Sequence, residues 1–106
     1  MPQEPLTVHI LYRAQPGKGD AGVEALEALV STVVEKEPDC LGISVHRDVA
    51  DPDRILLFEL WTSRAAYLGP HLQTPHLRAF LEGAAALFAG PPEISFWENR
   101  ADLRRL

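Results

Sequence analysis

Glu59 and His71 are the two side chains of this sequence whose type and setting best suit acid–base chemistry. Glu59 lies in the apolar run 55–61, and strand alternation places it on the same face as Leu57 and Trp61. An ionised carboxylate among apolar side chains is costly unless it is paired. We therefore expect Glu59 either to have a partner at a sheet or dimer interface, or to have a raised pKa that suits a catalytic role.

His71 follows the Gly69-Pro70 break and therefore lies in a connection rather than in a periodic helix. A neutral imidazole at the mouth of a cleft between helices and sheet can transfer a proton near pH 7. His71 is thus the candidate catalytic base, the alternative being a hydrogen bond that only holds the loop. His76, the second residue of the next helix, is expected to be exposed or capping, or to line the same pocket.

Aromatic side chains with a polar atom are the candidates for the wall of a substrate pocket. Tyr12 and Tyr67 carry hydroxyl groups that need a partner when buried, which favours a pocket position for both. Trp61, at the end of the same strand as Glu59, is a third candidate. Phe80 and Phe88 are expected to be ordinary core residues.

Several kinds of site have no signature in the sequence. His71 and His76 are five residues apart, unlike the i, i+4 pair of HExxH metal sites, and no third ligand is evident. The chain has no Ser-His-Asp arrangement, GxSxG, GxGxxG or P-loop, so hydrolase and nucleotide chemistry are not predicted. Cys40 is expected to be a small buried filler, because no neighbouring cation would activate its thiol. We therefore expect no metal and no cofactor.

Composition excludes further classes. The chain has 106 residues and a net charge of −5, which argues against nucleic acid or an anionic membrane as the main partner. No segment has the roughly 20 apolar residues of a transmembrane helix, and no signal peptide is visible. A single cysteine fits a reducing cytoplasm. We expect one domain, with its core at about 6–99 and a loose C-terminal tail at 100–106.

Hydrophobic periodicity predicts the elements that must position these residues. Residues 6–14 alternate as a strand, 20–37 have helical spacing up to Pro38, and 41–49 alternate again. The short turn Asp51-Pro52-Asp53 makes 41–49 and 54–61 an antiparallel hairpin.

The second half of the sequence predicts two helices and a strand. Thr62 or Ser63 can cap a short helix that ends at Leu68, and Thr74 with Pro75 can begin a longer one. The apolar stripe of the longer helix is expected to be Leu77, Phe80, Leu81, Ala84, Leu87 and Phe88, up to the terminator Gly90-Pro91-Pro92. Residues 93–98 form the last strand. The order β-α-β-β-α-β predicts an α+β, ferredoxin-like fold with a four-stranded antiparallel sheet.

The strand at 54–61 is apolar on both faces, which one helix layer cannot cover. Leu56, Phe58 and Leu60 would remain in water on the second face, and each would forgo about 1.5–3 kcal/mol of burial. We therefore predict a homodimer that pairs sheet on sheet. His9 and His46, both strand residues, are expected at such an interface rather than in catalysis.

From about residue 7 to 98 the chain resembles the antibiotic biosynthesis monooxygenase (ABM) family of dimeric α+β barrels. The resemblance rests on Pro16-Gly17-Lys18, Pro38-Asp39-Cys40-Leu41-Gly42, residues 48–53, Glu59-x-Trp61-Thr62-Ser63 with Ala65-Ala66, and His71-Leu72-Gln73-Thr74-Pro75-His76-Leu77 with Phe80. The family includes oxygenases that convert polyketide anthrones to quinones without a cofactor, haem-degrading enzymes, and proteins that act on small metabolites.

The haem-degrading branch fits this chain poorly. It needs an Asn on the first strand, where Tyr12 stands, and a Trp and a His in the second helical region. Pro70 or His71 stands at the Trp position, and Phe80 or Leu81 stands at the His position. Haem degradation is therefore disfavoured.

The resemblance implies a cofactor-independent monooxygenase that oxidises a small aromatic or polyketide-like substrate with O₂ to a quinone. His71 would be the base or a hydrogen-bond partner, Glu59 would orient or pair with it, and Trp61, Tyr12 and Tyr67 would shape the cleft. The alternatives are a non-oxygenase enzyme, such as an isomerase or a metabolite-degrading enzyme, and a non-catalytic small-molecule-binding barrel. An open cleft at His71 favours an enzyme, and a closed interior favours the non-catalytic alternative.

Overall fold

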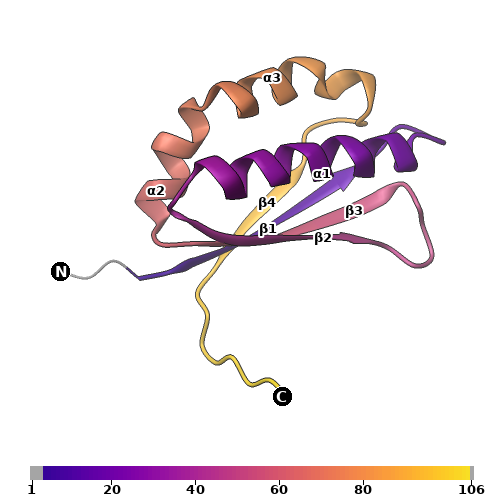
Figure 1. Ribbon diagram of the computed structural model, residues 1–106. Helices are drawn as coiled ribbons and strands as arrows, with labels where there is room; N and C mark the ends of the chain where they lie inside the picture. Colours follow the sequence, from indigo (N-terminus) through magenta and orange to yellow (C-terminus); the bar gives the residue numbers. More distant parts are fainter. Residues whose placement is uncertain (1–3, 106) are drawn as a thin grey trace.

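A computed structural model describes residues 4–105 as an antiparallel sheet whose helices all lie on one face (Figure 1). The strands are β1 (Leu6–Arg13), β2 (Cys40–Arg47), β3 (Arg54–Trp61) and β4 (Glu93–Trp97), in the spatial order β2-β3-β1-β4. The helices are α1 (Gly19–Lys36), α2 (Arg64–Leu68) and α3 (Pro75–Gly83), with 3₁₀ turns η1 (Pro70–Gln73) and η2 (Ala84–Ala86). The predicted ferredoxin-like β-α-β-β-α-β fold is confirmed. The tail predicted to be loose includes residue 106, which lies outside the described residues.

The predicted hairpin is present, with a longer turn than expected. Strands β2 and β3 pair from Cys40 with Trp61 to Arg47 with Ile55. Val49, expected at the end of the strand, lies in the turn and is fully exposed. The strand stops early because the Asp48 carboxylate accepts a hydrogen bond from the backbone N–H of Ala50, which turns the chain.

Helix α1 lies across the inner face of the sheet, and its C-terminal end fixes the position of Glu37. It begins after Gly17, whose φ of +79° glycine adopts without strain, and it buries Leu26, Val30 and Val33. Its last cap is Glu37, whose backbone N–H bonds the Val33 carbonyl. Pro38 follows and cannot continue the helix, so the Glu37 side chain is placed at the end of α1.

The second helical region departs from its predicted length. Helix α3 ends at Gly83, and the chain continues through η2 to Phe88, which bridges Ala14 at the end of β1. Gly83 ends the helix because glycine lowers helix stability. The bridge at Phe88 then draws the residues after Gly83 towards the sheet. Leu81, expected on the apolar stripe, is 57% exposed, so that assignment was wrong.

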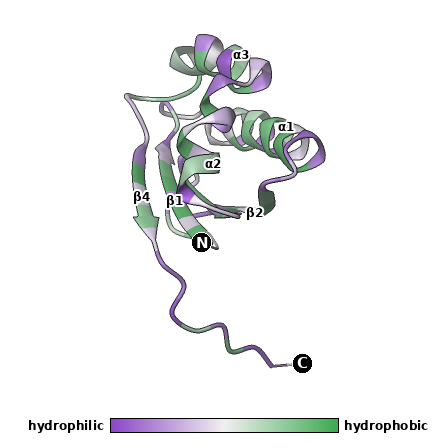
Figure 2. Ribbon diagram, turned by 90° about the vertical axis from the view of Figure 1, so that its left-hand side faces the viewer, coloured by the Kyte–Doolittle hydropathy of each residue, from purple (hydrophilic) through white to green (hydrophobic). Residues whose placement is uncertain are grey.

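The two faces of the sheet differ in how well they are covered. The inner face packs beneath the helices, and its core includes Val8, Leu57 and Trp61. On the outer face Phe58 is 41% exposed and Trp97 is 54% exposed, and no helix lies over them (Figure 2). Residues 98–105 form neither helix nor strand and extend away from the helices (Figure 1). None of the helices in residues 4–105 is long and apolar enough to cross a membrane.

Candidate functional site

The end of β3 places a carboxyl group and an indole together beneath the helices. Glu59 and Trp61 both point to the inner face, because residues two apart in a strand share a side. Trp61 Nε1 donates a hydrogen bond of 2.9 Å to Glu59 Oε1. Glu59 is 5% exposed and Trp61 is 1% exposed, so this is an interior polar contact.

His71 and Tyr67 complete an aromatic cluster around this pair. Ser63 caps α2 by accepting a hydrogen bond from the Ala66 N–H, and α2 in turn buries Tyr67. His71, in η1, lies with its ring centroid 4.6 Å from that of Trp61 and 5.1 Å from that of Tyr67. Four of the predicted site residues are thus brought together.

Glu37 links this cluster to His76 and was not predicted from the sequence. Glu37 Oε1 lies 2.9 Å from His71 Nδ1, and Glu37 Oε2 lies 2.6 Å from His76 Nε2. His76 is therefore neither exposed nor a helix cap, because it pairs with a carboxylate from α1. The only local signal for Glu37 was its place before Pro38, since its partners lie 34 and 39 residues away.

Burial governs the protonation of Glu59. Loss of solvent raises the pKa of Glu59 from its ordinary 4.5 to about 7. The hydrogen bond from Trp61 lowers this pKa, but by less than burial raises it. The negative charge of Glu37 adds a smaller upward contribution to the pKa. A carboxyl group of this kind can take up or release a proton near neutral pH.

The buried phenol and thiol groups remain protonated. Burial, with a smaller contribution from Glu59, raises the pKa of both Tyr12 and Tyr67 above the ordinary value, so their hydroxyls are available as hydrogen-bond donors. Burial likewise raises the pKa of the Cys40 thiol to about 11, as expected for a filler rather than a nucleophile.

Tyr12 stands apart from the His71 cluster. Its ring contacts Phe88 and Phe80, with centroids 5.0 and 6.2 Å away, near the end of β1 that carries the Ala14 bridge. In the β1–β3 register, Val8 rather than Tyr12 lies opposite Glu59. The Tyr12 ring therefore packs among apolar side chains, although Glu59 and Tyr67 are close enough to contribute to its raised pKa. Its place in a substrate pocket stays a prediction.

The inner face of β4 borders the cluster. Ile94 and Phe96 point towards the helix side, yet they are 48% and 40% exposed, so the helices leave them uncovered. Phe96 meets the Tyr67 ring with centroids 5.7 Å apart, and the Arg64 guanidinium lies 5.4 Å from the Phe96 ring centroid. Half-exposed side chains therefore border the aromatic cluster at this edge, whereas Trp61, Tyr67 and His71 in the cluster are only 1%, 3% and 5% exposed.

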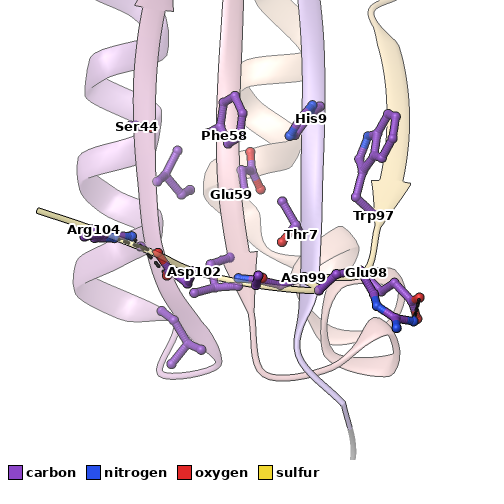
Figure 3. Close-up of a pocket in the computed structure, with 16 residues that line it drawn as sticks. Thr7, His9, Ser44, Phe58, Glu59, Trp97, Glu98, Asn99, Asp102 and Arg104 are labelled. Atoms are coloured by element: carbon purple, nitrogen blue, oxygen red, sulfur yellow. Dashed lines mark hydrogen bonds and ion pairs between the residues drawn. The ribbon is translucent and has the colours of Figure 1, made fainter.

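A hollow lies on the outer face of the sheet, and Glu59 of the cluster is among the residues that line it (Figure 3). It has a volume of about 850 Å³ and is bounded by β1 to β4 and by the C-terminal tail (Figure 3). His9, Phe58 and Trp97 stand side by side in its wall (Figure 3). Within residues 4–105, no three acidic, histidine or cysteine side chains are arranged to bind a metal ion.

A ferredoxin-like fold with a carboxyl–imidazole–indole cluster between its helices and its sheet defines the structural class. The chain belongs to the antibiotic biosynthesis monooxygenase (ABM) family, whose profile matches residues 5–83. It is similar to a probable quinol monooxygenase, YgiN, of Escherichia coli, with 37% identity over 73% of this chain and 82% of the relative.

Two further relatives are similar over more of the chain. An uncharacterized protein of Synechocystis, sll1783, is 33% identical over 90% of this chain, which spans only 63% of that relative's length. The crystal structure of PA3566 from Pseudomonas aeruginosa has 31% identity and a TM-score of 0.83, over 95% of this chain and 99% of that protein.

Proposed function

We propose that this protein is a cofactor-independent monooxygenase that oxidises a small aromatic or polyketide-like substrate, such as an anthrone, with O₂ to a quinone. The observation that carries the proposal is that a buried acid, Glu59, and a buried imidazole, His71, both contact Trp61. Family membership and the similarity to a probable quinol monooxygenase support the same activity.

The proposed reaction begins with proton removal. The His71 imidazole takes a proton from the substrate, and the resulting electron-rich anion transfers an electron to O₂. Oxygen then bonds to the substrate carbon as a peroxide, which takes the proton back from His71. Cleavage of its O–O bond with loss of the second C–H proton releases water, so that a CH₂ group and O₂ become a carbonyl group and water. Tyr67 and the protonated form of Glu59 are donors that stabilise negative charge, which is most effective where water is excluded.

The proposal includes a homodimer. The outer sheet face carries Leu56, Phe58 and Leu60 on β3 and Trp97 on β4, and an antiparallel sheet that faces water would carry polar residues there. A second copy of the chain, packed sheet on sheet, would bury these side chains. The Glu59–His71 cluster would then lie on the far side of each sheet from the interface.

Oxygen uptake with dithranol, an anthrone, tests the activity. The wild type is expected to consume O₂ and form the quinone, and His71→Asn is expected to lower kcat by about 10²- to 10⁴-fold, the usual contribution of a positioned base. Gln73→Asn, which changes an exposed neighbour in η1, is the matched control. Undiminished turnover in His71→Asn would remove His71 from the mechanism.

A non-catalytic small-molecule-binding role is the second candidate. The burial of His71 favours it, because His71 is not among the residues that line the hollow on the outer face. Under this alternative, anthrones and quinols bind, as measured by quenching of tryptophan fluorescence, but O₂ uptake does not exceed that of the uncatalysed reaction.

A further inference from the structure

We propose that Glu37 is a positioning residue that sets the tautomer and orientation of His71, and that His76 holds Glu37 in place for this task. The inference rests on the proposed function, because it concerns the base of the proposed reaction. It adds a residue from a different helix to the pair that we assign to catalysis, and it gives His76 a role outside the substrate pocket.

The geometry around Glu37 is that of a carboxylate shared by two imidazoles. His71 Nδ1 lies 2.9 Å from Oε1 and 3.1 Å from Oε2, and His76 Nε2 contacts Oε2 at 2.6 Å. The side chains of Glu37, His71 and His76 are 11%, 6% and 16% exposed. A carboxylate this deeply buried needs donors, and the two imidazoles supply them.

The contacts determine which nitrogen of His71 can act as a base. A carboxylate accepts hydrogen bonds, so the Nδ1 that faces Glu37 carries the proton of the neutral ring. The other nitrogen, Nε2, is then unprotonated and is directed away from Glu37, on a ring that packs against Trp61 and Tyr67. When Nε2 takes a proton from the substrate, the ring becomes an imidazolium, and the adjacent carboxylate stabilises its charge.

The backbone of His71 is held independently of Glu37. The Thr74 hydroxyl donates a 2.9 Å hydrogen bond to the His71 carbonyl, and the Thr74 N–H donates to the same oxygen. Loss of Glu37 is therefore expected to free the imidazole ring rather than the loop. A role in positioning can thus be distinguished from a role in folding.

Glu37→Gln tests the proposal because an amide replaces one of the two accepting oxygens with an NH₂ donor. Whichever way the amide is turned, its NH₂ group faces one of the two imidazoles, which must then present an unprotonated nitrogen. Nitrogen-15 NMR of the imidazole rings above neutral pH reports the tautomers directly, with assignments from His71→Asn and His76→Asn. The wild type is expected to carry its protons on His71 Nδ1 and His76 Nε2. Glu37→Gln is expected to change the tautomer of at least one of these two rings.

Kinetics supply the second readout. Glu37→Gln is expected to lower kcat for dithranol oxidation by about 10²- to 10⁴-fold with a smaller change in KM, because the base rather than the binding surface is affected. His76→Asn retains the Glu37–His71 contact and is expected to lower kcat by less than about 10-fold. Glu35→Gln, on the exposed side of the same helix, is the control for the loss of charge.

The results separate this inference from the proposed function. The inference is overturned if the neutral His71 ring of the wild-type protein carries its proton on Nε2. It is also overturned if Glu37→Gln keeps the tautomers and the kcat of the wild type. The wild-type spectrum gives this answer even when Glu37→Gln does not fold. The absence of wild-type turnover contradicts the proposed function, whereas the spectra test the tautomers without any substrate.

Discussion

Trp61 Nε1 donates a 2.9 Å hydrogen bond to Glu59 Oε1 from a position two residues further along the same strand. The two side chains share the inner face of β3, so the contact is built into the strand itself. It gives a buried carboxyl group a donor, but it does not offset the loss of solvent, and the pKa of Glu59 remains raised to about 7. This relationship leads to predictions on stability and on titration.

Glu59 is expected to make the protein less stable as the pH rises from about 4.5 to 7. The unfolded carboxyl has its ordinary pKa of 4.5 and the folded one a pKa of about 7, so the folded state binds more protons in this interval. The corresponding loss is about 3 kcal/mol in the free energy of unfolding. Urea denaturation across this interval measures it.

Glu59→Gln is expected to remove this part of the pH dependence, because the amide does not titrate. The exposed Glu24→Gln is the control and should retain the wild-type slope. Equal slopes for the wild type and Glu59→Gln would show that Glu59 is ionised in the folded state at low pH.

Trp61→Phe is expected to raise the pKa of Glu59 further. The substitution keeps an aromatic ring but removes the indole N–H, which is the interaction that lowers this pKa. Carbon-13 NMR of the Glu59 carboxyl, followed as a function of pH, measures the change.

Trp97→Phe is a matched control for Trp61→Phe. The Trp97 indole donates to the Ser95 hydroxyl on the outer face, so its loss should leave Glu59 titrating near 7. An unchanged Glu59 titration in Trp61→Phe would mean that the hydrogen bond does not act on the ionised carboxylate.

Phe58→Glu is expected to dissociate the proposed homodimer. Phe58 is 41% exposed at the centre of the outer face, between His9 and His46, and burial of such a ring contributes about 1.5–3 kcal/mol per protomer. Light scattering after size-exclusion chromatography should give a dimer for the wild type and a monomer for Phe58→Glu.

Leu81→Glu is the control for this experiment. Leu81 is 57% exposed on α3, on the helix side of the molecule, so a charge there should leave the dimer intact. A monomeric wild type at micromolar concentration would contradict the sheet-to-sheet pairing.

The sequence predicted the fold well because its elements are marked by local signals. Strand alternation, the Asp51-Pro52-Asp53 turn and the Ser63 cap each depend on residues close in the chain. The predicted end of α3 was wrong, because the Ala14–Phe88 bridge that draws the chain to the sheet joins residues far apart in the sequence.

The site was only partly predictable for the same reason. The placement of Glu59 and Trp61 on one face follows from strand periodicity, and the structure places both there. Glu37 offered no such pattern, because its contacts with His71 and His76 require α1, η1 and α3 to meet. The local sequence at the end of a helix does not show whether a glutamate there is exposed or buried. Only the packing of the folded chain decides this.

The origin of the oxygen atom in the product tests the central claim most directly. Dithranol is oxidised by the wild-type protein under ¹⁸O₂, and the quinone is analysed by mass spectrometry, with a parallel reaction in ¹⁸O-labelled water. We expect one ¹⁸O atom from O₂ in the new carbonyl group, formed much faster than in His71→Asn. A product without the label, or one formed equally fast without protein, would contradict the assignment of this protein as a monooxygenase.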